Sequence, residues 1–589
     1  MTGDGWVTLA VLVVVVVILA RDVVAPSVAV VGAVVALLVS GVVNAQQAFV
    51  GFSNPAPLTV AALYVLARAI EKTGALQPVV SGTLGEGKGR STTLVRLLVP
   101  TAAASAFLNN TPIVAMLVPQ VRNWADRYGH SVSRFLMPLS FAAILGGMVT
   151  LIGTSTNLVI SGMLQATGYE PLGMFELTRV ALPVALVGIV AIVMLVPRLL
   201  PERRAARREI EQEFREFVVG MRVERGGPID GKSVESAKLR NLQGVFLVEI
   251  ERDGELISPV GPGTKLHGGD RLTFVGRVGQ IVDLQGMRGL ASTEREHLAE
   301  FDSARHTFLE AVIGPASPLV GRTLKAVGFR STYQAAVVAI HRAGQRVDAK
   351  LGSVRLKVGD TLLLLADEGF QWRWRDRNVF LLVSRLGGAP PGVTRKAWVA
   401  GLVGLGIVLA AGLGVMPILN AALLGAFALV VFGVLTPGEA RTAVDLDVVL
   451  TIAGAFGLAS ALQVSGLASA AASVLVDVFG GLGPRGGLLA IVLATVGLVC
   501  VITNNAAAVL MFPIAMSTAT ELGLAERPFA IALALAASAS FLTPVSYQTN
   551  LMVYGPGGYR FSDYPRLGLP LVVLVVVAAV LVVPVFWGL

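Results

Sequence analysis

The stretch that decides the fold is Ala104-Ser105-Ala106-Phe107-Leu108-Asn109-Asn110-Thr111-Pro112, and an altered form of it returns as Val499-Cys500-Val501-Ile502-Thr503-Asn504-Asn505-Ala506. Each copy is a short polar sequence inside an apolar run. A second polar sequence follows each copy, namely Gly153-Thr154-Ser155-Thr156-Asn157 and Ser546-Tyr547-Gln548-Thr549-Asn550. Asn157 lies 47 residues after Asn110, and Asn550 lies 46 residues after Asn504. Two distant parts of the chain therefore repeat the same polar interruptions in the same order.

The composition places these interruptions in a membrane. Of the 589 residues, 54% are hydrophobic and 14% are charged, whereas about a quarter of a soluble protein is charged. The mean hydropathy is +0.73, and many apolar runs are long enough to span a bilayer. Lipid satisfies no backbone hydrogen bonds, so a polar break at membrane depth survives where it lines a cavity or a site. Four breaks in a repeated arrangement predict a substrate and ion site rather than four kinked helices.

Cysteine content and charge exclude some other classes of protein. Cys500 is the single cysteine, so an intramolecular disulfide is impossible and nothing indicates a thiol redox site. The net charge is +9, but the basic residues cluster beside apolar runs, which indicates membrane topology and not a nucleic-acid partner. The apolar run from Val7 to Ala20 has no basic segment before it. We interpret it as a retained span and not as a cleaved signal peptide.

The apolar pattern predicts a polytopic α-helical membrane protein with two transmembrane blocks, residues 1–198 and 395–589. Each block is expected to have five spans and one re-entrant hairpin, with the asparagines at the hairpin tip. In the first block the spans are predicted at 5–20, 27–43, 58–76, 135–164 and 177–196, and the hairpin at 92–123. In the second block the spans are predicted at 398–415, 419–435, 448–467, 529–553 and 571–586, and the hairpin at 488–518.

The two blocks read as an internal duplication. Gly41 and Gly74 recur as Gly433 and Gly466 at an offset of 392, and the offset is 393 or 394 at the polar sequences. Pro112 is expected at the first position of the returning hairpin helix, with Asn110 or Thr111 as its cap.

An odd number of spans in each block would insert the two blocks with opposite topology, giving an inverted repeat. Short cytoplasmic loops are rich in Lys and Arg. The loop 44–57 has neither, whereas the predicted inner loops carry Arg21, Lys72, Lys88, Arg90, Arg96, Arg122, Arg127, Arg134, Arg441, Arg560 and Arg566. The pattern predicts a plasma (inner) membrane protein with both termini outside and residues 199–394 cytoplasmic. Arg485 and Arg527 would lie outside, against the rule.

The central region predicts two small α+β modules, at 199–300 and 301–394. It begins with a basic cluster, which we interpret as a topology signal in contact with anionic lipid: Arg198, Arg203, Arg204, Arg207 and Arg208. Strands are predicted at 245–250, 271–275, 335–340 and 361–365, between Gly/Asp turns.

The modules repeat each other at an offset of 90. Gly231-Lys232-Ser233-Val234 matches Gly321-Arg322-Thr323-Leu324, and Gly269-Asp270 matches Gly359-Asp360. These motifs resemble the RCK-C (TrkA-C) regulatory module of potassium-conductance regulators. No Gly-rich dinucleotide fingerprint accompanies them. The modules are therefore expected either to bind a small cytosolic ligand or to act as a passive dimerisation or stability element.

The polar sequences suit sodium and an anion. They contain no Asp, Glu, Lys or Arg, whereas proton coupling usually needs a titratable group at membrane depth. Backbone carbonyls freed at hairpin tips and broken helices, with Asn and Thr side chains, can coordinate sodium. The N-termini of half-helices offer free N–H groups and a partial positive charge to an anion.

With two hairpin tips centred on asparagine, each followed by [GS]-x-x-T-N, the chain resembles the divalent anion:sodium symporter (DASS) family. That family usually carries Ser-Asn-Thr at both tips, where this chain has Asn109-Asn110-Thr111 and Thr503-Asn504-Asn505. The resemblance implies a scaffold domain that dimerises and a transport domain that moves like an elevator, with Na⁺ as the coupling ion.

The resemblance also implies roles for individual residues. One sodium site would be formed by Ser105, Asn109, Asn110 and Gly153, and the other by Thr503, Asn504 and Ser546. The substrate would face Thr111 and Asn505, with Asn110, Asn504, Thr154 and Thr549 beside it.

Sulfate is the favoured substrate, because DASS members with paired central modules resemble the sulfate-type branch. A C4-dicarboxylate or citrate is the alternative, and related families move arsenite or exchange sodium for protons. An exchanger would need a deep carboxylate, for which Glu71 and Asp126 are the candidates. A channel regulated by the RCK-C-like modules is a different class. The apolar blocks show no His/Asp/Glu cluster or Ser/His pair, so the chain is not predicted to be an enzyme.

Overall fold

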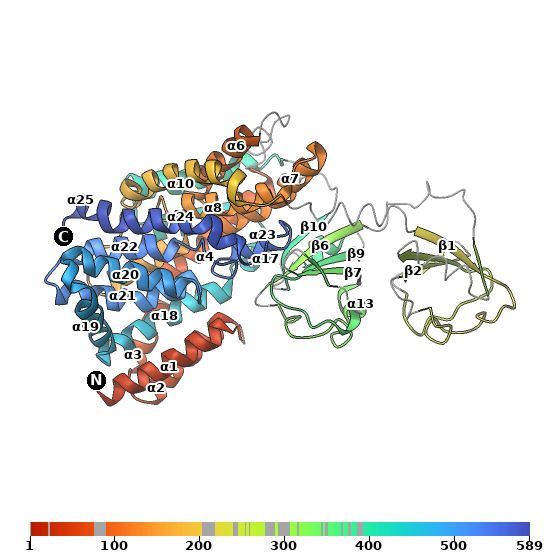
Figure 1. Ribbon diagram of the computed structural model, residues 1–589, viewed down its shortest axis with the longest axis horizontal. Helices are drawn as coiled ribbons and strands as arrows, with labels where there is room; N and C mark the ends of the chain where they lie inside the picture. Colours follow the sequence, from red (N-terminus) through yellow and green to blue (C-terminus); the bar gives the residue numbers. More distant parts are fainter. Residues whose placement is uncertain are drawn as a thin grey trace. The chain divides into compact units, whose positions relative to one another are not determined.

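The computed structural model describes residues 2–21, 24–75, 90–202, 218–239, 245–253, 255–257, 260–276, 289–292, 307–314, 317–342, 345–347, 351–366, 369–374, 379–385 and 393–589. The chain forms two compact units, one from Met1–Arg203 with Ala389–Leu589 and the other from Arg204–Gly388 (Figure 1). Lys88 and the predicted basic residues Arg203, Arg204, Arg207 and Arg208 lie outside the described residues, as do the side chains of Arg90 and Asp126.

The first unit is helical. Its first block contains α1 (Gly3–Ala20), α2 (Pro26–Val39), α3 (Ala45–Ala48), α4 (Pro55–Thr73), α6 (Arg90–Ser105), α7 (Asn110–Tyr128), α8 (Leu136–Gly147), α9 (Ser155–Ala166) and α10 (Thr178–Leu199). Its second block contains α15 (Ala397–Gly412), α16 (Ile418–Val431), α17 (Pro437–Ala443), α18 (Leu446–Val464), α19 (Leu467–Phe479), α20 (Pro484–Val499), α21 (Asn504–Glu521), α22 (Glu526–Ser538), α23 (Gln548–Tyr554), α24 (Asp563–Val577) and α25 (Val583–Trp587).

Three described helices are long and apolar enough to cross a membrane: Thr178–Leu199, Leu446–Val464 and Asp563–Trp587. The last of these joins α24 to α25 through one π-helical turn, Ala578–Val582. Seven further described helices are apolar but shorter, at 10–17 residues. The described part of the chain therefore places a helix in each predicted span and two helices in each predicted hairpin and each predicted broken span.

Two details of the sequence interpretation were wrong. The helix α19 stands where no separate element was predicted, between the span α18 and the hairpin that begins with α20. In the first hairpin, α7 begins at Asn110 and its cap is Asn109, whose Oδ1 accepts a hydrogen bond from Thr111 N at 3.4 Å. Pro112 is therefore the third helical residue and not the first, and neither Asn110 nor Thr111 is the cap.

The four glycines that match between the blocks share one backbone conformation. Gly41 and Gly433 have φ of +80° and +63°, and Gly74 and Gly466 have φ of +68° and +74°. Glycine adopts this left-handed region without the steric cost that a Cβ atom brings. Each pair therefore ends a helix at the same point of both blocks.

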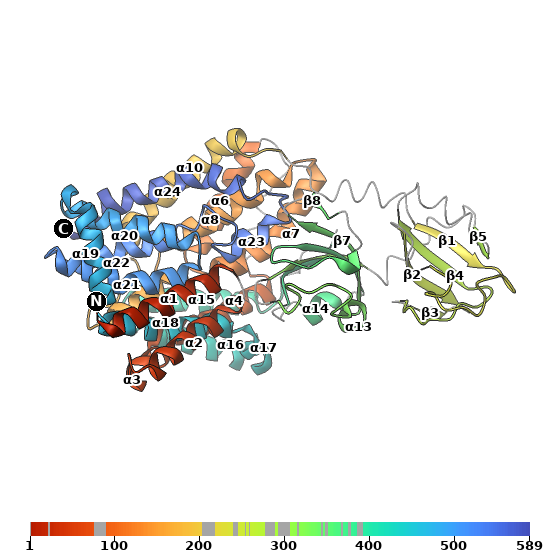
Figure 2. The same ribbon diagram turned by 60° about the horizontal axis from the view of Figure 1, so that its bottom comes forward.

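Helices of the two blocks pack against each other (Figures 1 and 2). The pairs are α2 with α18, α4 with α16, α9 with α21 and α10 with α24. An apolar cluster joins α4 to α15 and α16 through buried residues that include Leu66, Ile70, Ile407 and Leu429. Lys72 Nζ adds an ion pair with Glu439 Oε2 at 2.7 Å, between α4 and α17.

Arg527, which the charge pattern places on the outer side, has a partner. Its guanidinium donates to both oxygens of Glu176, at 2.8 Å and 2.6 Å, and to the Glu170 carbonyl at 2.5 Å. Burial favours the neutral form of Glu176, but the bonds from Arg527 hold the pKa of that carboxyl below its usual range. Arg527 therefore remains an exception to the positive-inside pattern, which counts Lys and Arg whether or not they have acidic partners.

The second unit contains two antiparallel five-stranded sheets. The first has β1 (Val218–Val223), β2 (Val245–Arg252), β3 (Glu255–Ile257), β4 (Arg271–Gly276) and β5 (Leu290–Ser292), in the order β3-β2-β4-β1-β5. The second has β6 (Thr307–Ile313), β7 (Ala335–Arg342), β8 (Gln345–Arg346), β9 (Thr361–Ala366) and β10 (Phe380–Arg385), with the short helices α13 (Phe329–Tyr333) and α14 (Phe370–Trp374). Read from the other edge, its order β8-β7-β9-β6-β10 repeats the first.

Each of the two sheets also contains an Arg–Asp ion pair at the same position. Arg252 donates to both oxygens of Asp270, and Arg342 donates to both oxygens of Asp360, 90 residues later, with all four distances at 2.7–2.8 Å. Burial alone would raise the pKa of Asp270, but Arg252 and the His267 N–H hold it below its usual range. All four strands predicted from sequence are present, as β2, β4, β7 and β9.

Candidate functional site

The first hairpin tip is built around the buried amide of Asn110, the first residue of α7. One end of this amide lies 2.5 Å from Ser105 Oγ, at the end of α6. The same end lies 3.1 Å from the Ala143 carbonyl oxygen and 3.3 Å from the Gly153 carbonyl oxygen. The opposite end lies 3.0 Å from the Tyr547 hydroxyl. The structure therefore brings together Ser105, Asn110 and Gly153 of the four residues predicted for one sodium site, whereas the side chain of the fourth, Asn109, caps α7.

This set of oxygens allows two arrangements of the amide. If the amide nitrogen points toward Ser105, it donates to the surrounding oxygens, and the amide oxygen accepts from the Tyr547 hydroxyl. If the amide oxygen points toward Ser105, it accepts from the Ser105 hydroxyl but also faces the Ala143 and Gly153 carbonyl oxygens, a repulsion that a cation among these oxygens would relieve, while the nitrogen donates to Tyr547. Neutral oxygens from carbonyls, an amide and a hydroxyl are ligands that suit a hard cation.

Each tip contacts the broken span of the other block. Thr111 Oγ1 donates to Gln548 Oε1 at 3.2 Å, which joins the first tip to α23. Asn505 Oδ1, on the second tip, accepts from Ser155 Oγ at 3.1 Å and from Thr156 Oγ1 at 3.0 Å, on α9. Gln548 follows Ser155 by 393 residues, so the two cross-contacts use matching positions.

Two matching asparagines form hydrogen bonds across the interruptions of the two broken spans. Asn157 Nδ2 donates to the Thr150 carbonyl at 2.9 Å, and Asn550 Nδ2 donates to the Thr543 carbonyl at 3.2 Å. In each case the asparagine lies seven residues after the carbonyl it holds. Asn550 Nδ2 also donates to the Ser540 carbonyl at 2.7 Å. These bonds satisfy carbonyls that the broken helices leave without intrahelical partners.

Three long helices begin at the site. They are α7, α9 and α21, which start at Asn110, Ser155 and Asn504. A helix N-terminus carries about half an elementary positive charge and free N–H groups. Together they offer an anion positive potential without a charged side chain. Among the described residues, no group of three or more His, Cys, Asp or Glu side chains could hold a metal ion.

The remaining predicted residues lie as follows. Thr503 caps α21, and Asn504 Oδ1 accepts from the N–H of Asn505 at 3.0 Å. Ser546 Oγ donates to the Thr543 carbonyl at 2.8 Å. Thr154 caps α9 and is bonded to the Tyr547 hydroxyl. Thr549 is fully buried and accepts from Ser140 Oγ at 2.8 Å, so in this conformation its hydroxyl is already engaged.

Four further residues take part in these contacts: Ser155, Thr156, Tyr547 and Gln548. All four belong to the polar sequences Gly153–Asn157 and Ser546–Asn550. The signal for them was their place in those sequences, but which tip they contact depends on the packing of the two blocks. Glu71, a candidate proton site, is paired with Arg68 at 3.1 Å.

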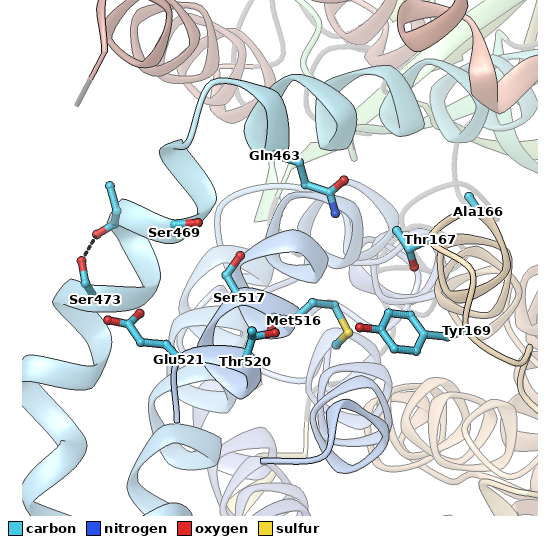
Figure 3. A pocket seen from close by; sticks show the side chains of 11 residues that line it. Ala166, Thr167, Tyr169, Gln463, Ser469, Ser473, Met516, Ser517, Thr520 and Glu521 are labelled. Atoms are coloured by element: carbon cyan, nitrogen blue, oxygen red, sulfur yellow. Dashed lines mark hydrogen bonds between the residues drawn. The ribbon is translucent and has the colours of Figure 1, made fainter. Parts of the chain in front are cut away.

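A separate cavity of about 840 Å³ lies at the far end of α21 (Figure 3). Ser517, Thr520 and Glu521 line it from α21, and Gln463 lines it from α18. Ser517 is 13 residues from Asn504, about 20 Å along the helix. Among the described lining residues, Glu521 is the one with a charged side chain. The cavity is therefore less suited to an anion than the tips are.

Comparisons with known proteins give the following similarities. The family model CitMHS, citrate transporter, matches residues 12–523 and 416–588. A Chlamydomonas reinhardtii protein with the provisional name sulfur deprivation response regulator is 37% identical, over 93% of this chain and 95% of its own length. An uncharacterized transporter of Synechocystis sp. is 36% identical, over 94% and 92%. Sodium/sulfate cotransporter 1 of Chlamydomonas reinhardtii is 25% identical, over 91% and 84%.

Proposed function

Because the chain belongs to the CitMHS family of citrate transporters, we propose that it is a sodium-coupled symporter of a small divalent anion, and that the anion is sulfate. The family is one of multi-pass membrane transporters and not of enzymes. Sodium is a co-substrate in this proposal and not a cofactor.

The observation that carries the proposal is the pair of cross-contacts at the tips. Thr111 meets Gln548, and Asn505 meets Ser155 and Thr156. These groups are neutral donors and acceptors beside three helix N-termini, an arrangement that suits a bound oxyanion. An anion between the tips would take over these hydrogen bonds and join both blocks. The broken spans of both blocks would then contact the same substrate.

Tyr547 favours a small anion over citrate. Its position matches Thr154 at an offset of 393, and its hydroxyl reaches both Asn110 and Thr154. A tyrosine ring therefore fills space on one side of the site where the other side has a threonine. The name of the sodium/sulfate cotransporter relative points to the same substrate and coupling ion. Citrate, the substrate in the family description, is the second candidate.

The Asn110 amide supplies a route for coupling. With sodium among Ser105 Oγ, the Ala143 and Gly153 carbonyls and Asn110 Oδ1, the amide nitrogen donates to Tyr547. The phenol proton is then free to bond the anion. Without sodium the amide turns, its oxygen accepts the phenol proton, and the anion loses this donor. Sodium binding at the first tip thereby raises the affinity for the anion.

We further propose the inverted-repeat arrangement and the elevator motion that the DASS resemblance implies. The domains are the transmembrane repeats 1–198 and 395–589 and two RCK-C-like modules, 199–300 and 301–394. The orientation has both termini outside, the modules cytoplasmic and a homodimeric scaffold. The shared strand order of the two sheets and the repeated Arg–Asp pair support two copies of one module.

Radiolabelled uptake by purified protein in liposomes tests the proposal. We expect sulfate uptake that saturates and requires an inward sodium gradient, with weak competition from citrate and succinate. Strong citrate uptake with no sulfate competition would assign the second candidate substrate. Non-saturating sulfate flux without sodium dependence would indicate a channel and contradict the symport proposal.

A further inference from the structure

We propose that the Ser540 hydroxyl is a sodium ligand at the second hairpin tip, in the role that Ser105 has at the first. This inference rests on the proposed sodium-coupled function. It assigns a residue that lies outside the polar sequences at the tips and the ends of the breaks.

The second tip lacks the serine of the first. Ser105 is the last residue of α6, five residues before Asn110, and its Oγ lies 2.5 Å from the Asn110 amide. The matching residue is Val499, the last residue of α20 and five residues before Asn504. Its side chain has methyl groups and no oxygen. A cation site built at Asn504 on the same plan is therefore short of one hydroxyl.

The glycine that packs on Asn110 shows where another hydroxyl can enter. Gly147 lies against the Asn110 amide so closely that a Cβ atom at Gly147 would be 2.5 Å from Asn110 Oδ1 and 2.9 Å from Nδ2. The residue that follows Gly147 by 393 is Ser540. In the first block a Cβ atom at this position would lie against the amide of the tip asparagine, and the proposal places the Ser540 side chain on the same side of Asn504.

One close approach near Ser540 matches one near Gly147. In the first break, a Cβ atom at Gly153 would be 2.6 Å from the Gly147 carbonyl oxygen. In the second break, the matching pair is Ser546 and Ser540, and Ser546 Oγ lies 3.4 Å from the Ser540 carbonyl oxygen. In both breaks the later residue of the pair therefore lies beside the carbonyl of the earlier one, although α22 ends at Ser538, two residues before the point that matches the end of α8.

The Ser540 hydroxyl is buried without a partner. The residue is 1% exposed, and its Oγ has no hydrogen-bond partner. Burying a hydroxyl without a hydrogen-bond partner or a bound cation costs folding free energy. A sodium ion held by Asn504 Oδ1 and the Ser540 hydroxyl supplies that partner. Each tip then has one serine hydroxyl beside its asparagine, from the hairpin in the first block and from the broken span in the second.

Ser538 provides a matched control. It is 4% exposed, and its hydroxyl is also buried without a partner. Its matching residue in the first block is Leu145, whose side chain packs where a Cβ atom at Gly188 would stand, on α10 and away from the tip. Loss of the Ser538 hydroxyl therefore removes a similar buried group without touching the proposed ion site.

The experiment measures sodium binding to purified protein by thermal stabilisation, with choline as the replacement cation, and sodium-dependent sulfate uptake in parallel. We expect Ser540→Ala to raise the half-saturating sodium concentration about tenfold, the loss of one ligand contact. Ser538→Ala should stay within about twofold of the wild type. Val499→Thr combined with Ser540→Gly, which moves the hydroxyl back to the hairpin, should bind sodium more tightly than Ser540→Gly alone.

The outcomes separate the two proposals. If the wild type shows neither sodium-dependent stabilisation nor sodium-dependent uptake, the proposed function fails. If the wild type shows both and Ser540→Ala matches the wild type or Ser538→Ala, the assignment of Ser540 is wrong. If Ser540→Ala does not fold, the comparison of Ser540→Gly with and without Val499→Thr decides, and equal sodium affinities there would overturn the assignment.

Discussion

Replacement of Tyr547 by phenylalanine tests the coupling route at the first tip. The Tyr547 hydroxyl lies 3.0 Å from the Asn110 amide. In the sodium-bound arrangement its proton is free for the anion, and a hydrogen bond to a charged group contributes about 1.5–3 kcal/mol. Tyr547→Phe should therefore weaken anion binding about 10- to 150-fold at saturating sodium. Without sodium the phenol proton is held by Asn110, and the same change should have little effect.

The assay is a sulfate titration of purified protein at saturating sodium and in choline, read by thermal stabilisation. Tyr169→Phe is the control, because it removes one tyrosine hydrogen bond, to Glu526 at 3.0 Å, far from the tips. The control should leave the sodium dependence of sulfate affinity unchanged. An equal loss of affinity with and without sodium in Tyr547→Phe would refute the amide switch, and no loss in either condition would remove Tyr547 from the anion site.

Three other predictions follow from the fold. A proton gradient with sodium absent should not drive sulfate uptake, because the tips have no titratable group and Glu71 is paired with Arg68; proton-driven uptake would contradict this. Replacing residues 231–386 by a flexible linker should preserve sodium dependence and substrate choice but change the rate or its control, so a switch of substrate, measured by uptake competition, would refute the separation of roles. Asp270→Asn should weaken the first module by on the order of 2 kcal/mol at neutral pH and reduce its acid sensitivity. The pKa of Asp270 is lowered in the fold, so this stability is present above the unfolded value of about 4 and is lost as pH falls through the folded value; hydrogen exchange in β2 and β4 measures it.

Local signals predicted the helices and the breaks. Apolar runs with polar interruptions located both hairpins and both broken spans, and Gly/Asp turns located the four strands. The helix α19 was missed because the predicted span ended at residue 467 and the hairpin began at residue 488, and the 13 residues of Leu467–Phe479 are too few for a membrane span of their own. The sequence did not identify Asn109 as the cap of α7, because Asn109, Asn110 and Thr111 are consecutive residues that can each cap a helix. The backbone conformation decides which of them does so.

The partners of the tips depend on tertiary packing. The spacing of the polar sequences showed that Asn110 and Asn505 belong to a site, but not that Asn110 meets Tyr547 and Asn505 meets Ser155. Those contacts join residues more than 300 positions apart. Ser540 gave no signal, because a serine in an alanine-rich helix end resembles an ordinary small core residue. The evidence for its proposed role is its burial and the glycine, Gly147, at the matching position of the first block.

The central claim is that the two asparagine tips form one site for sodium and sulfate. Sodium-driven sulfate uptake by Asn110→Ala and Asn504→Ala, reconstituted in liposomes at equal protein content, tests it most directly. We expect each variant to be expressed and folded, as judged by size-exclusion chromatography, and transport to be lost in both. Normal sodium-driven uptake by either variant would contradict the account.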